Sequence, residues 1–263
     1  TCLWTHPVDF SKSITITQDG NQWYCSVLCE INIKDKQKKD KNIVGIDVGL
    51  KDFAVLSDGE VVKRQRITKK YEDKLSIEQR RLSRKAKGSK NRHKQRKVVQ
   101  NLHRKIRNSR KDFLNKTTHD IITKYDGICL EDLNISGMMK NDKLSKNIAD
   151  VSWNEFKRQL AYKSLWNFKH FVEIDRFFPS TKTCSSCGEI QDMELSDRIY
   201  RCKKCGLVID RDLNSAINIL NKGLHTLGLR GINACGDDKV HDFLKENQVI
   251  VNEARTKNMW ITT

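Results

Sequence analysis

Four cysteines in two CxxC pairs are the densest group of metal-ligand side chains in this sequence of 263 residues. Fourteen residues separate the pairs Cys184/Cys187 and Cys202/Cys205. Each pair is followed by a glycine, whose backbone can adopt the sharp turn needed after the second thiolate. This spacing predicts a zinc ribbon in which four thiolates hold one structural Zn²⁺ and leave no open position for water. An accidental cysteine cluster and two disulfides are the alternatives.

Three acidic residues lie in apolar segments or open a helix, far apart along the chain. Asp47 lies inside the run 43–49, Glu131 closes the run 128–131, and Asp212 opens a helical pattern. Ionised carboxylates in apolar strands are costly unless a cation compensates them. Phosphodiester hydrolysis uses two hard cations held by carboxylates, so the three acids predict a site for two Mg²⁺ or Mn²⁺ ions. Taken singly, they have other interpretations: a strand-end turn former, a surface acid and a helix N-cap, respectively.

The positive charge of the chain is concentrated in one block. Residues 63–124 hold 23 of the 50 Lys and Arg residues and five of the 33 acids, a net charge of +18, whereas the remainder has a net charge of −1. Such a block predicts a surface that binds a polyanion. Apolar residues at helical spacing on either side of a turn at 87–90 predict two long antiparallel helices with basic open faces. A solvated charged hairpin without a ligand is the alternative.

Local patterns also predict the elements around this block. The first 31 residues indicate a β-hairpin with a turn at Asp19-Gly20, and further strands are expected at 43–49, 53–56, 61–62, 128–131 and 171–178. The sequence from Ser152 to Glu155 is typical of a capping box and predicts a helix that starts at Ser152. A last helix is expected over Leu213–Leu220, with Gly223 as its stop.

The cysteines outside the two pairs indicate a reducing compartment. They are scattered along the chain: Cys2, Cys25, Cys29, Cys129 and Cys235. Cys25 and Cys29 share one face of the predicted hairpin, and we interpret them as core thiols rather than as a metal pair. No N-terminal segment resembles a signal peptide, and no apolar run reaches membrane-spanning length. The sequence therefore predicts a cytoplasmic protein.

In combination, these motifs resemble the TnpB/OrfB family of transposon-encoded nucleases, which is related to type V CRISPR effectors. The motifs occur in the family's order: Gly45-Ile-Asp47-Val-Gly49-Leu50, Leu130-Glu131-Asp132-Leu133-Asn134, Arg176-Phe-Phe-Pro-Ser180-Thr-Lys-Thr-Cys184-Ser-Ser-Cys187-Gly188 and Asp210-Arg-Asp212-Leu-Asn214-Ser-Ala216. The match covers residues 10–225 and encloses the same helical insertion.

The resemblance implies a fold and a domain organisation. The fold is α/β: an RNase H-like (RuvC-like) mixed sheet with a helical-hairpin insertion and a four-cysteine zinc ribbon, preceded by a partial β-barrel. The implied parts are a wedge-like barrel segment at 1–41, nuclease parts at 42–62, 125–183 and 206–228, the basic helical insertion at 63–124, the ribbon at 184–205 and a tail at 229–263. We interpret the tail as loosely ordered.

The resemblance also implies an activity, metal-dependent endonuclease cleavage of DNA guided by RNA. Asp47, Glu131 and Asp212 would be the catalytic acids that bind two Mg²⁺ or Mn²⁺ ions. Asp210 is then a supporting or structural acid rather than a ligand, while Arg211 and Asn214 could orient the scissile phosphate or the carboxylates. The ribbon, with its structural zinc, is expected to fold a lid or strand-loading element beside Asp212.

The implied partners are a guide RNA from the transposon end and target DNA, with no membrane, and we expect a monomer. The basic side chains expected to contact nucleic acid are Arg80, Arg81, Arg84, Lys85, Lys90, Arg92, Lys94, Arg96, Lys97, Arg104, Arg107 and Arg211. Family members carry a helical recognition module and the first half of the barrel upstream. Because this chain begins at Thr1, we expect an N-terminal truncation.

Two other functions are compatible with the sequence. The first is a DNA- or RNA-binding accessory of transposition that no longer cleaves, which the missing upstream module favours and the retention of all three acids disfavours. The second is a structure-selective junction resolvase of the same fold. Resolvases need no four-cysteine module, so the ribbon argues against this second alternative.

Overall fold

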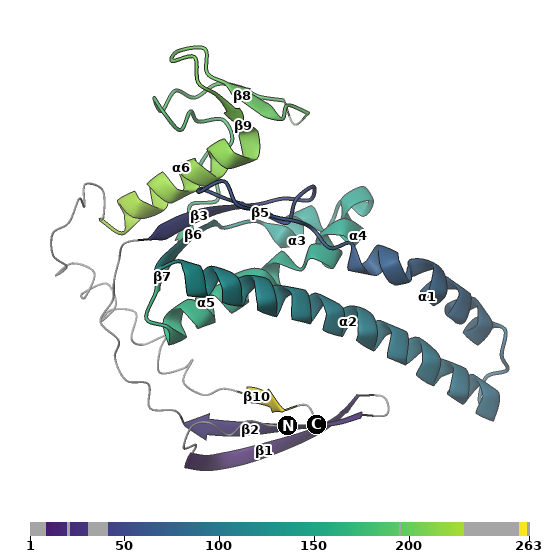
Figure 1. Ribbon diagram of the computed structural model, residues 1–263. Coiled ribbons are helices and arrows are strands. Elements are labelled where there is room, and N and C mark those ends of the chain that lie inside the picture. Colours follow the sequence, from purple (N-terminus) through teal and green to yellow (C-terminus); the bar gives the residue numbers. More distant parts are fainter. Residues whose placement is uncertain (1–8, 20–21, 31–41, 195, 229–257, 262–263) are drawn as a thin grey trace. The chain divides into compact units, whose positions relative to one another are not determined.

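The computed structural model describes residues 9–19, 22–30, 42–194, 196–228 and 258–261, which belong to two compact units (Figure 1). The first unit contains residues up to 35, residues 67–109 and the C-terminal strand. The second unit contains residues 36–66 and 110–239, and therefore all the predicted acids and the four cysteines.

The first unit contains a three-stranded antiparallel sheet in the order β1-β2-β10. β1 (Asp9–Asp19) and β2 (Gln22–Glu30) form the predicted hairpin, with Ile16 opposite Cys25. The predicted face is only partly buried, because Val27 is buried and Trp23 is exposed. β10 (Asn258–Ile261) pairs with β2, so one segment of the predicted tail is a strand. The rest of the tail, the turn at residue 20 and the side chain of Cys29 lie outside the described residues.

The basic block forms the predicted helical hairpin. α1 (Ile67–Ser83) lies in the first unit, and α2 (Lys90–Lys124) begins there and ends in the second (Figure 1). Gly88 supplies the left-handed backbone of the turn, with φ of +82°. Arg92 Nη1 donates to the carbonyls of Leu82 (2.8 Å) and Lys85 (3.0 Å) and thereby closes the end of α1. No helix among the described residues combines the length and the apolar composition needed to cross a membrane.

The second unit is built on a mixed five-stranded sheet in the order β5-β4-β3-β6-β7. β3 (Ile43–Val48), β4 (Ala54–Leu56) and β5 (Val61–Val62) form an antiparallel meander. β6 (Gly127–Glu131) is parallel to β3, and β7 (His170–Ile174) is parallel to β6. The α/β class and the mixed sheet are as predicted. The carboxyl ends of the central strands β3 and β6 therefore lie side by side.

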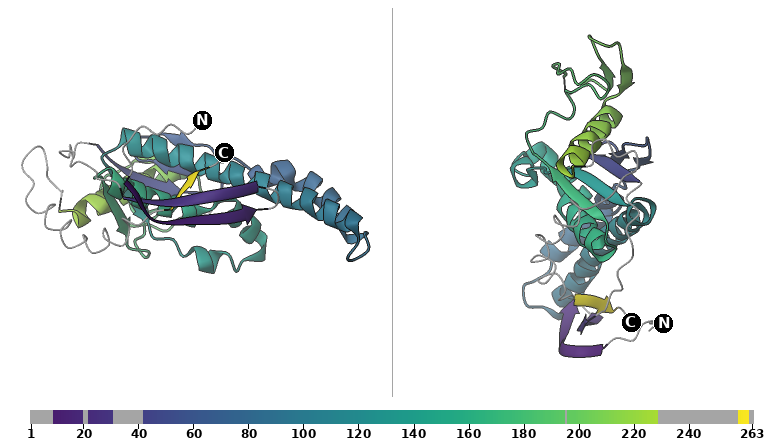
Figure 2. Two further views of the ribbon diagram at one scale, coloured as in Figure 1. Left: turned by 90° about the horizontal axis from the view of Figure 1, so that it is seen from below. Right: turned by 90° about the vertical axis from the view of Figure 1, so that its left-hand side faces the viewer.

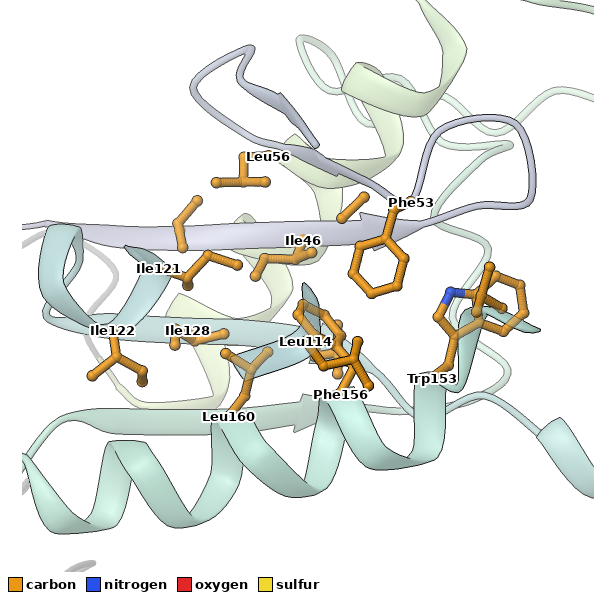
Figure 3. Packing of buried hydrophobic residues seen from close by; sticks show 14 of the residues in the cluster. Ile46, Phe53, Leu56, Leu114, Ile121, Ile122, Ile128, Trp153, Phe156 and Leu160 are labelled. Atoms are coloured by element: carbon orange, nitrogen blue, oxygen red, sulfur yellow. The ribbon is translucent and has the colours of Figure 1, made fainter. Parts of the chain in front are cut away.

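Helices cover both faces of this sheet (Figures 1 and 2). α5 (Trp153–Trp166) and the end of α2 pack on the face that carries Ile46 and Ile128, where Leu114, Phe156 and Leu160 complete the core (Figure 3). α6 (Arg211–Thr226) packs on the opposite face, where Cys129 and Ile219 belong to a second cluster. Two short helices, α3 (Ile135–Met138) and α4 (Asp142–Val151), connect β6 to α5.

The backbone of α6 lies unusually close to the sheet. A Cβ atom on Gly45 of β3 would come within 3.0 Å of the Ala216 carbonyl and the Leu220 amide. A Cβ on Gly223 would collide with the side chain of Cys129 of β6, within 3.0 Å of its Sγ. The prediction that Gly223 stops this helix is therefore wrong: the helix continues to Thr226, and the glycine is needed for packing.

Two further local predictions are wrong. The expected capping box at Ser152 is not formed, although Ser152 precedes α5 as predicted. The preceding helix α4 ends directly before Ser152, which has a left-handed backbone conformation (φ +55°). Its hydroxyl donates to Ala149 O instead of capping α5. Glu155 accepts from Arg158 and Gln159 instead. The strand predicted at 171–178 is β7, which ends at Ile174, because the Asp175 carboxylate accepts the Phe177 amide at 2.7 Å and turns the chain.

Candidate metal centre and carboxylate site

Asp47 and Glu131 lie at the carboxyl ends of neighbouring parallel strands. Ile46 pairs with Leu130, so the next residue on each strand is one of the two acids. Side chains alternate between the faces of a sheet, and Ile46 and Leu130 belong to the core beneath α5. Both carboxylates therefore point to the opposite face, where α6 packs.

Asp212 lies in the first turn of α6 and reaches this face from above the sheet. The N-cap of α6 is Asp210, whose carboxylate accepts the amides of Asp212 (2.9 Å) and Leu213 (3.1 Å). The interpretation of Asp212 as the helix N-cap is therefore wrong, and Asp210 has the structural role. The Asp212 carboxylate accepts instead from the guanidinium of Arg211, at 3.0 and 3.1 Å.

Asp212 and Glu131 are both close enough to Asp47 for their charges to affect its pKa. Burial raises the pKa of Asp47 well above its usual value, and the charges of Asp212 and then Glu131 raise it further, whereas the charge of Arg211 lowers it. Burial raises the pKa of Glu131 to about 7, although a hydrogen bond from Ser180 opposes the shift. The folded chain thus brings two desolvated carboxylates, Asp47 and Glu131, together with the partly exposed carboxylate of Asp212 near Asp47.

The spacing of these acids differs from that of the cysteines. Among the described residues, only the four cysteine sulfurs form a group of ligand atoms that all lie within 4.8 Å of one another. The three carboxylates are more widely spaced. Two divalent ions stand about 3.5–4 Å apart in sites of the two-metal type, so their ligands need not converge on one point. Oxygen donors in a desolvated site that raises carboxylate pKa values fit hard divalent cations.

The four cysteines have the geometry of a zinc site. Sγ of Cys184 lies 3.6 Å from Sγ of Cys205, and Sγ of Cys187 lies 3.6 Å from Sγ of Cys202. Sulfurs about 2.3 Å from a tetrahedral zinc would be about 3.8 Å apart, whereas disulfide sulfurs are about 2.0 Å apart. The spacing therefore fits one Zn²⁺, and the two-disulfide alternative is wrong.

The two cysteine knuckles have the same backbone geometry. Gly188 and Gly206 have φ angles of +74° and +75°, and their amides donate to the first cysteine of their own pair at 2.9 and 3.0 Å. β8 (Ile199–Arg201) and β9 (Val208–Asp210) form the hairpin that carries the second knuckle. Backbone hydrogen bonds from Cys205 and Lys204 lower the pKa of Cys202 to about 6, which favours the thiolate form that zinc binds.

Comparison with known proteins places the chain in a family. Residues 26–142 match a family model described as OrfB_IS605, "Probable transposase", and residues 153–219 match the model "Cas12f1-like, TNB domain". A "Putative RNA-guided DNA endonuclease" of Streptomyces pristinaespiralis is 36% identical over 89% of this chain and 58% of its own length. "Putative RNA-guided DNA endonuclease InsQ" of Escherichia coli (strain K12) is 34% identical over 86% and 58%. The chain belongs to the TnpB family.

The family relationship extends to viral proteins and to the fold. "TnpB-like protein L79" of Acanthamoeba polyphaga mimivirus is 30% identical over 81% of this chain and 44% of its own length. The chain thus spans about half the length of the curated relatives it matches. A solved structure titled "Cryo-EM structure of CRISPR-Cas12f Ternary Complex" aligns with a TM-score of 0.53 and 18% identity, covering 79% of this chain and 44% of that one, which shows a shared mixed α/β fold.

Asp132, the second acid of the family motif around Glu131, has a different environment from its neighbour. Lys157 Nζ lies 2.9 Å from one of its carboxylate oxygens, and Arg176 Nη2 lies 2.5 Å from the other. Hydrogen bonds from these two side chains lower its pKa. Asp132 is therefore neutralised by cations of the protein itself, whereas the side chain of Glu131 lies on the α6 face.

Several residues connect α6 to the ribbon. Asn214, which the sequence suggested as an orienting group, donates to Thr183 O at 2.7 Å and accepts from Ser185 N at 3.0 Å, on either side of Cys184. Sequence reasoning gave no role to Asn218 or Ser180. The available signal was the pair of amide side chains one turn apart on the inner face of α6, which also carries the buried Ser215.

The predicted nucleic-acid contacts fall into two groups. Those exposed on the helical hairpin are Arg80, Arg81, Arg84, Lys90, Lys94, Arg96, Lys97 and Arg107, and Lys85 is half-buried beside them. Three are less exposed and have protein partners: Arg92 caps α1, Arg104 contacts Asp19 of β1, and Arg211 contacts Asp212. The exposed Arg107 also pairs with Asp19. The role of both groups in binding stays a prediction.

Proposed function

We propose that this chain is the catalytic part of an RNA-guided DNA endonuclease that hydrolyses phosphodiester bonds with two divalent cations. The observation that supports this most directly is the raised pKa of Asp47. Burial raises it most, and the charges of Asp212 and Glu131, which come from separate segments, raise it further. The family relatives named as RNA-guided DNA endonucleases support the substrate class. We further interpret the mixed sheet as RNase H-like (RuvC-like) and the β1-β2-β10 sheet as part of a barrel.

The proposed chemistry assigns a task to each acid. Asp47, Glu131 and Asp212 would hold two Mg²⁺ or Mn²⁺ ions, and such ions supply an activated water and charge stabilisation for the leaving oxygen. Asp47 and Glu131 must lose their protons to act as ligands, and their raised pKa values make this step dependent on pH. Arg211 is fixed beside Asp212, where its guanidinium can orient that carboxylate. The expected products carry a 5′-phosphate and a 3′-hydroxyl.

In this proposal the zinc site and the basic hairpin take no part in the cleavage step: the zinc site stabilises the ribbon, and the hairpin binds nucleic acid. Four thiolates saturate a tetrahedral Zn²⁺, so the ribbon has a structural role. The exposed Lys and Arg residues of α1 and α2 would hold phosphates of a guide RNA paired with target DNA, or of a displaced strand. Base pairing with the guide would supply the sequence specificity.

The test compares Asp47→Ala with Asp192→Asn, which changes an exposed acid of the ribbon. Both variants are purified with the RNA that accompanies the chain in its host, and cleavage of a plasmid matched to that RNA is measured in Mg²⁺. We expect Asp47→Ala to lose more than about 100-fold in rate, because even residues behind a metal ligand typically cost 10–100-fold. Asp192→Asn should cleave as wild type does.

Two results would contradict the proposal. Undiminished cleavage by Asp47→Ala would remove this acid from the reaction. DNA or RNA binding that persists in EDTA, combined with no nicking by the wild-type chain in Mg²⁺ or Mn²⁺, would instead identify a binding protein that does not cleave.

A further inference from the structure

We infer that the zinc ribbon positions the carboxylate site through one short segment, residues 180–185, which we call the strap. The strap follows β7 by a few residues and leads into the first cysteine knuckle; it is hydrogen-bonded to α6, and its first residue, Ser180, lies beside Glu131. Zinc would then fix the geometry of two of the three acids although it lies outside their site. The catalytic consequence rests on the proposed function, whereas the structural coupling does not.

The bonds to α6 come from two buried amides one helical turn apart. Asn218 Nδ2 donates to the carbonyls of Ser180 (2.8 Å) and Thr183 (2.6 Å). Asn214 Nδ2 donates to Thr183 O at 2.7 Å, and its Oδ1 accepts from Ser185 N at 3.0 Å. Both asparagines are almost completely buried, at 0% and 4% exposure, so these amides depend on the strap for their hydrogen bonds.

The bond to the sheet comes from Ser180, which is itself buried. Its hydroxyl is close enough to the Glu131 carboxylate to oppose the rise in the pKa of that group, while its carbonyl accepts from Asn218 at 2.8 Å. One residue of the strap is therefore bonded to α6, which carries Asp212, and lies beside Glu131 of β6. A shift of Ser180 would change the orientation of Glu131 and the packing of the helix together.

The bond to the zinc site comes from Cys184, which lies between the two strap residues held by Asn214. Cys184 is buried, its amide donates to Glu189 O at 2.8 Å, and its sulfur is one of the four clustered ligands. Zinc bound by this sulfur fixes the backbone of Thr183 and Ser185 in the position that the two asparagines require. Without zinc, four close thiols have no common partner, and the strap loses its anchor.

Mn²⁺ affinity in the absence of nucleic acid tests the inference on the full chain. Three samples are compared with wild type: a zinc-depleted chain transferred to chelator-free buffer, Asn218→Ala, and Ser180→Ala. Each should retain its circular dichroism and lose about 10–100-fold in Mn²⁺ affinity by titration calorimetry, as is typical for groups that orient metal ligands. The two variants should still contain one zinc per chain by atomic absorption.

Two further variants separate positioning from general damage. Ser180→Thr keeps a hydroxyl and should restore the Mn²⁺ affinity that Ser180→Ala loses. Asn221→Ala changes an asparagine of the same helix outside the Asn214/Asn218 pair, and it should bind Mn²⁺ as wild type does. Wild-type Mn²⁺ affinity in the folded zinc-depleted chain, or in both Ser180→Ala and Asn218→Ala, would overturn the inference.

Hydrogen exchange decides the inference even if the wild-type chain binds no Mn²⁺, a result that would refute the proposed function instead. Zinc depletion should then accelerate amide exchange in the strap, in the first two turns of α6 and at the end of β6, while the β3/β4 hairpin stays protected. Acceleration confined to residues 186–207 would show that the ribbon folds independently of the carboxylate site, and the inference would fail.

Discussion

The ribbon and the carboxylate site gather their ligands over very different lengths of chain. The ribbon takes its four sulfurs from residues 184–205, and they lie within 4.8 Å of one another. The carboxylate site takes its acids from residues 47, 131 and 212, which become neighbours only when β3 pairs with β6 and α6 packs across both strands. The entropy cost of closing a loop rises with its length, so the acids depend on long-range packing and the sulfurs do not.

This difference predicts which changes damage which site. A change in the core of the second unit should displace the acids while the ribbon still binds zinc. A change in the ribbon should remove zinc outright and reach the acids only through the strap. The two sites are therefore separate in how they form, and they are linked at Ser180 and the Asn214/Asn218 pair.

The largest expected effect is on zinc, in Cys184→Ser. Structural zinc contributes about 10–16 kcal/mol of apparent binding free energy in small zinc modules, and all four thiolates are needed for a closed tetrahedron. We expect zinc affinity to fall at least about 100-fold, measured by competition with a coloured chelator. Cys25→Ser, which changes a half-buried thiol of β2, is the control and should keep its zinc. Full zinc retention by Cys184→Ser would show that the cluster is not a four-thiolate site.

The second expected effect is on the fold around the acids, in Asp150→Ala. The Asp150 side chain is 5% exposed; Arg64 Nη2 lies 3.7 Å from one of its oxygens, and Arg110 Nε donates to the other at 3.1 Å. Arg64 also donates to Leu50 O, three residues after Asp47. Removing one partner of a buried ion pair costs about 3–5 kcal/mol, so urea unfolding should show a loss of this size with zinc content unchanged.

The matched control for Asp150→Ala is Asp112→Ala, which breaks the exposed pair between Asp112 and Lys116 on α2 (2.9 Å). An exposed pair one turn apart contributes about 0.3–0.5 kcal/mol, so this variant should be nearly as stable as wild type. Equal losses in the two variants would mean that burial does not decide the contribution of these ion pairs.

The same difference explains how much could be predicted from the sequence. The ribbon was accessible because CxxC spacing, a following glycine and a 14-residue gap all act within one short segment. The apolar runs around Asp47 and Glu131 were also local signals, and they predicted β3 and β6 correctly. That the two acids occupy corresponding positions depends on strand register, which no local pattern specifies.

What the sequence could not predict depends on contacts between distant segments. Gly223 has the appearance of a helix stop, and only the approach of α6 to Cys129 shows why a side chain is excluded there. Asn214 has the appearance of a phosphate ligand until Thr183 and Ser185 are placed beside it. Ser152 is the N-cap residue of α5 as predicted, yet the preceding helix fixes its conformation and its side chain does not cap α5.

Gly45→Ala sharpens the comparison with a single methyl group. The new Cβ would meet backbone atoms of α6, which cannot move aside as a flexible side chain can. Overpacking of this kind costs about 1–3 kcal/mol, and we expect about 3 kcal/mol by urea unfolding, with zinc retained. Gly59→Ala, in a turn with open space around its Cβ and φ of +90°, should cost only about 1 kcal/mol of backbone strain. A smaller loss for Gly45→Ala than for Gly59→Ala would contradict the close packing of α6.

The smallest expected effect is the pH dependence that Glu131 gives to stability. Its pKa is raised from 4.5 to about 7, so between these pH values the folded chain holds a proton that the unfolded chain has lost. Without divalent cations, the free energy of unfolding should therefore fall as pH rises through this window. One pKa unit corresponds to about 1.4 kcal/mol, and the partial exposure of the side chain reduces the total to about 2 kcal/mol.

Glu131→Gln isolates this effect, because glutamine keeps the shape of the protonated side chain but does not titrate. Below pH 4.5 the wild-type side chain is protonated in both states, so the difference in unfolding free energy between wild type and this variant should be constant. Between pH 4.5 and 7 wild type should lose stability relative to the variant, so the difference should change steadily. Saturating Mg²⁺ should reverse the wild-type trend, since the cation binds the ionised form and its affinity rises with pH up to about 7. The ribbon supplies the contrast, because zinc content should stay constant over the same range in both proteins. Parallel pH profiles for wild type and Glu131→Gln would show that Glu131 is not held in the desolvated site beside Asp47.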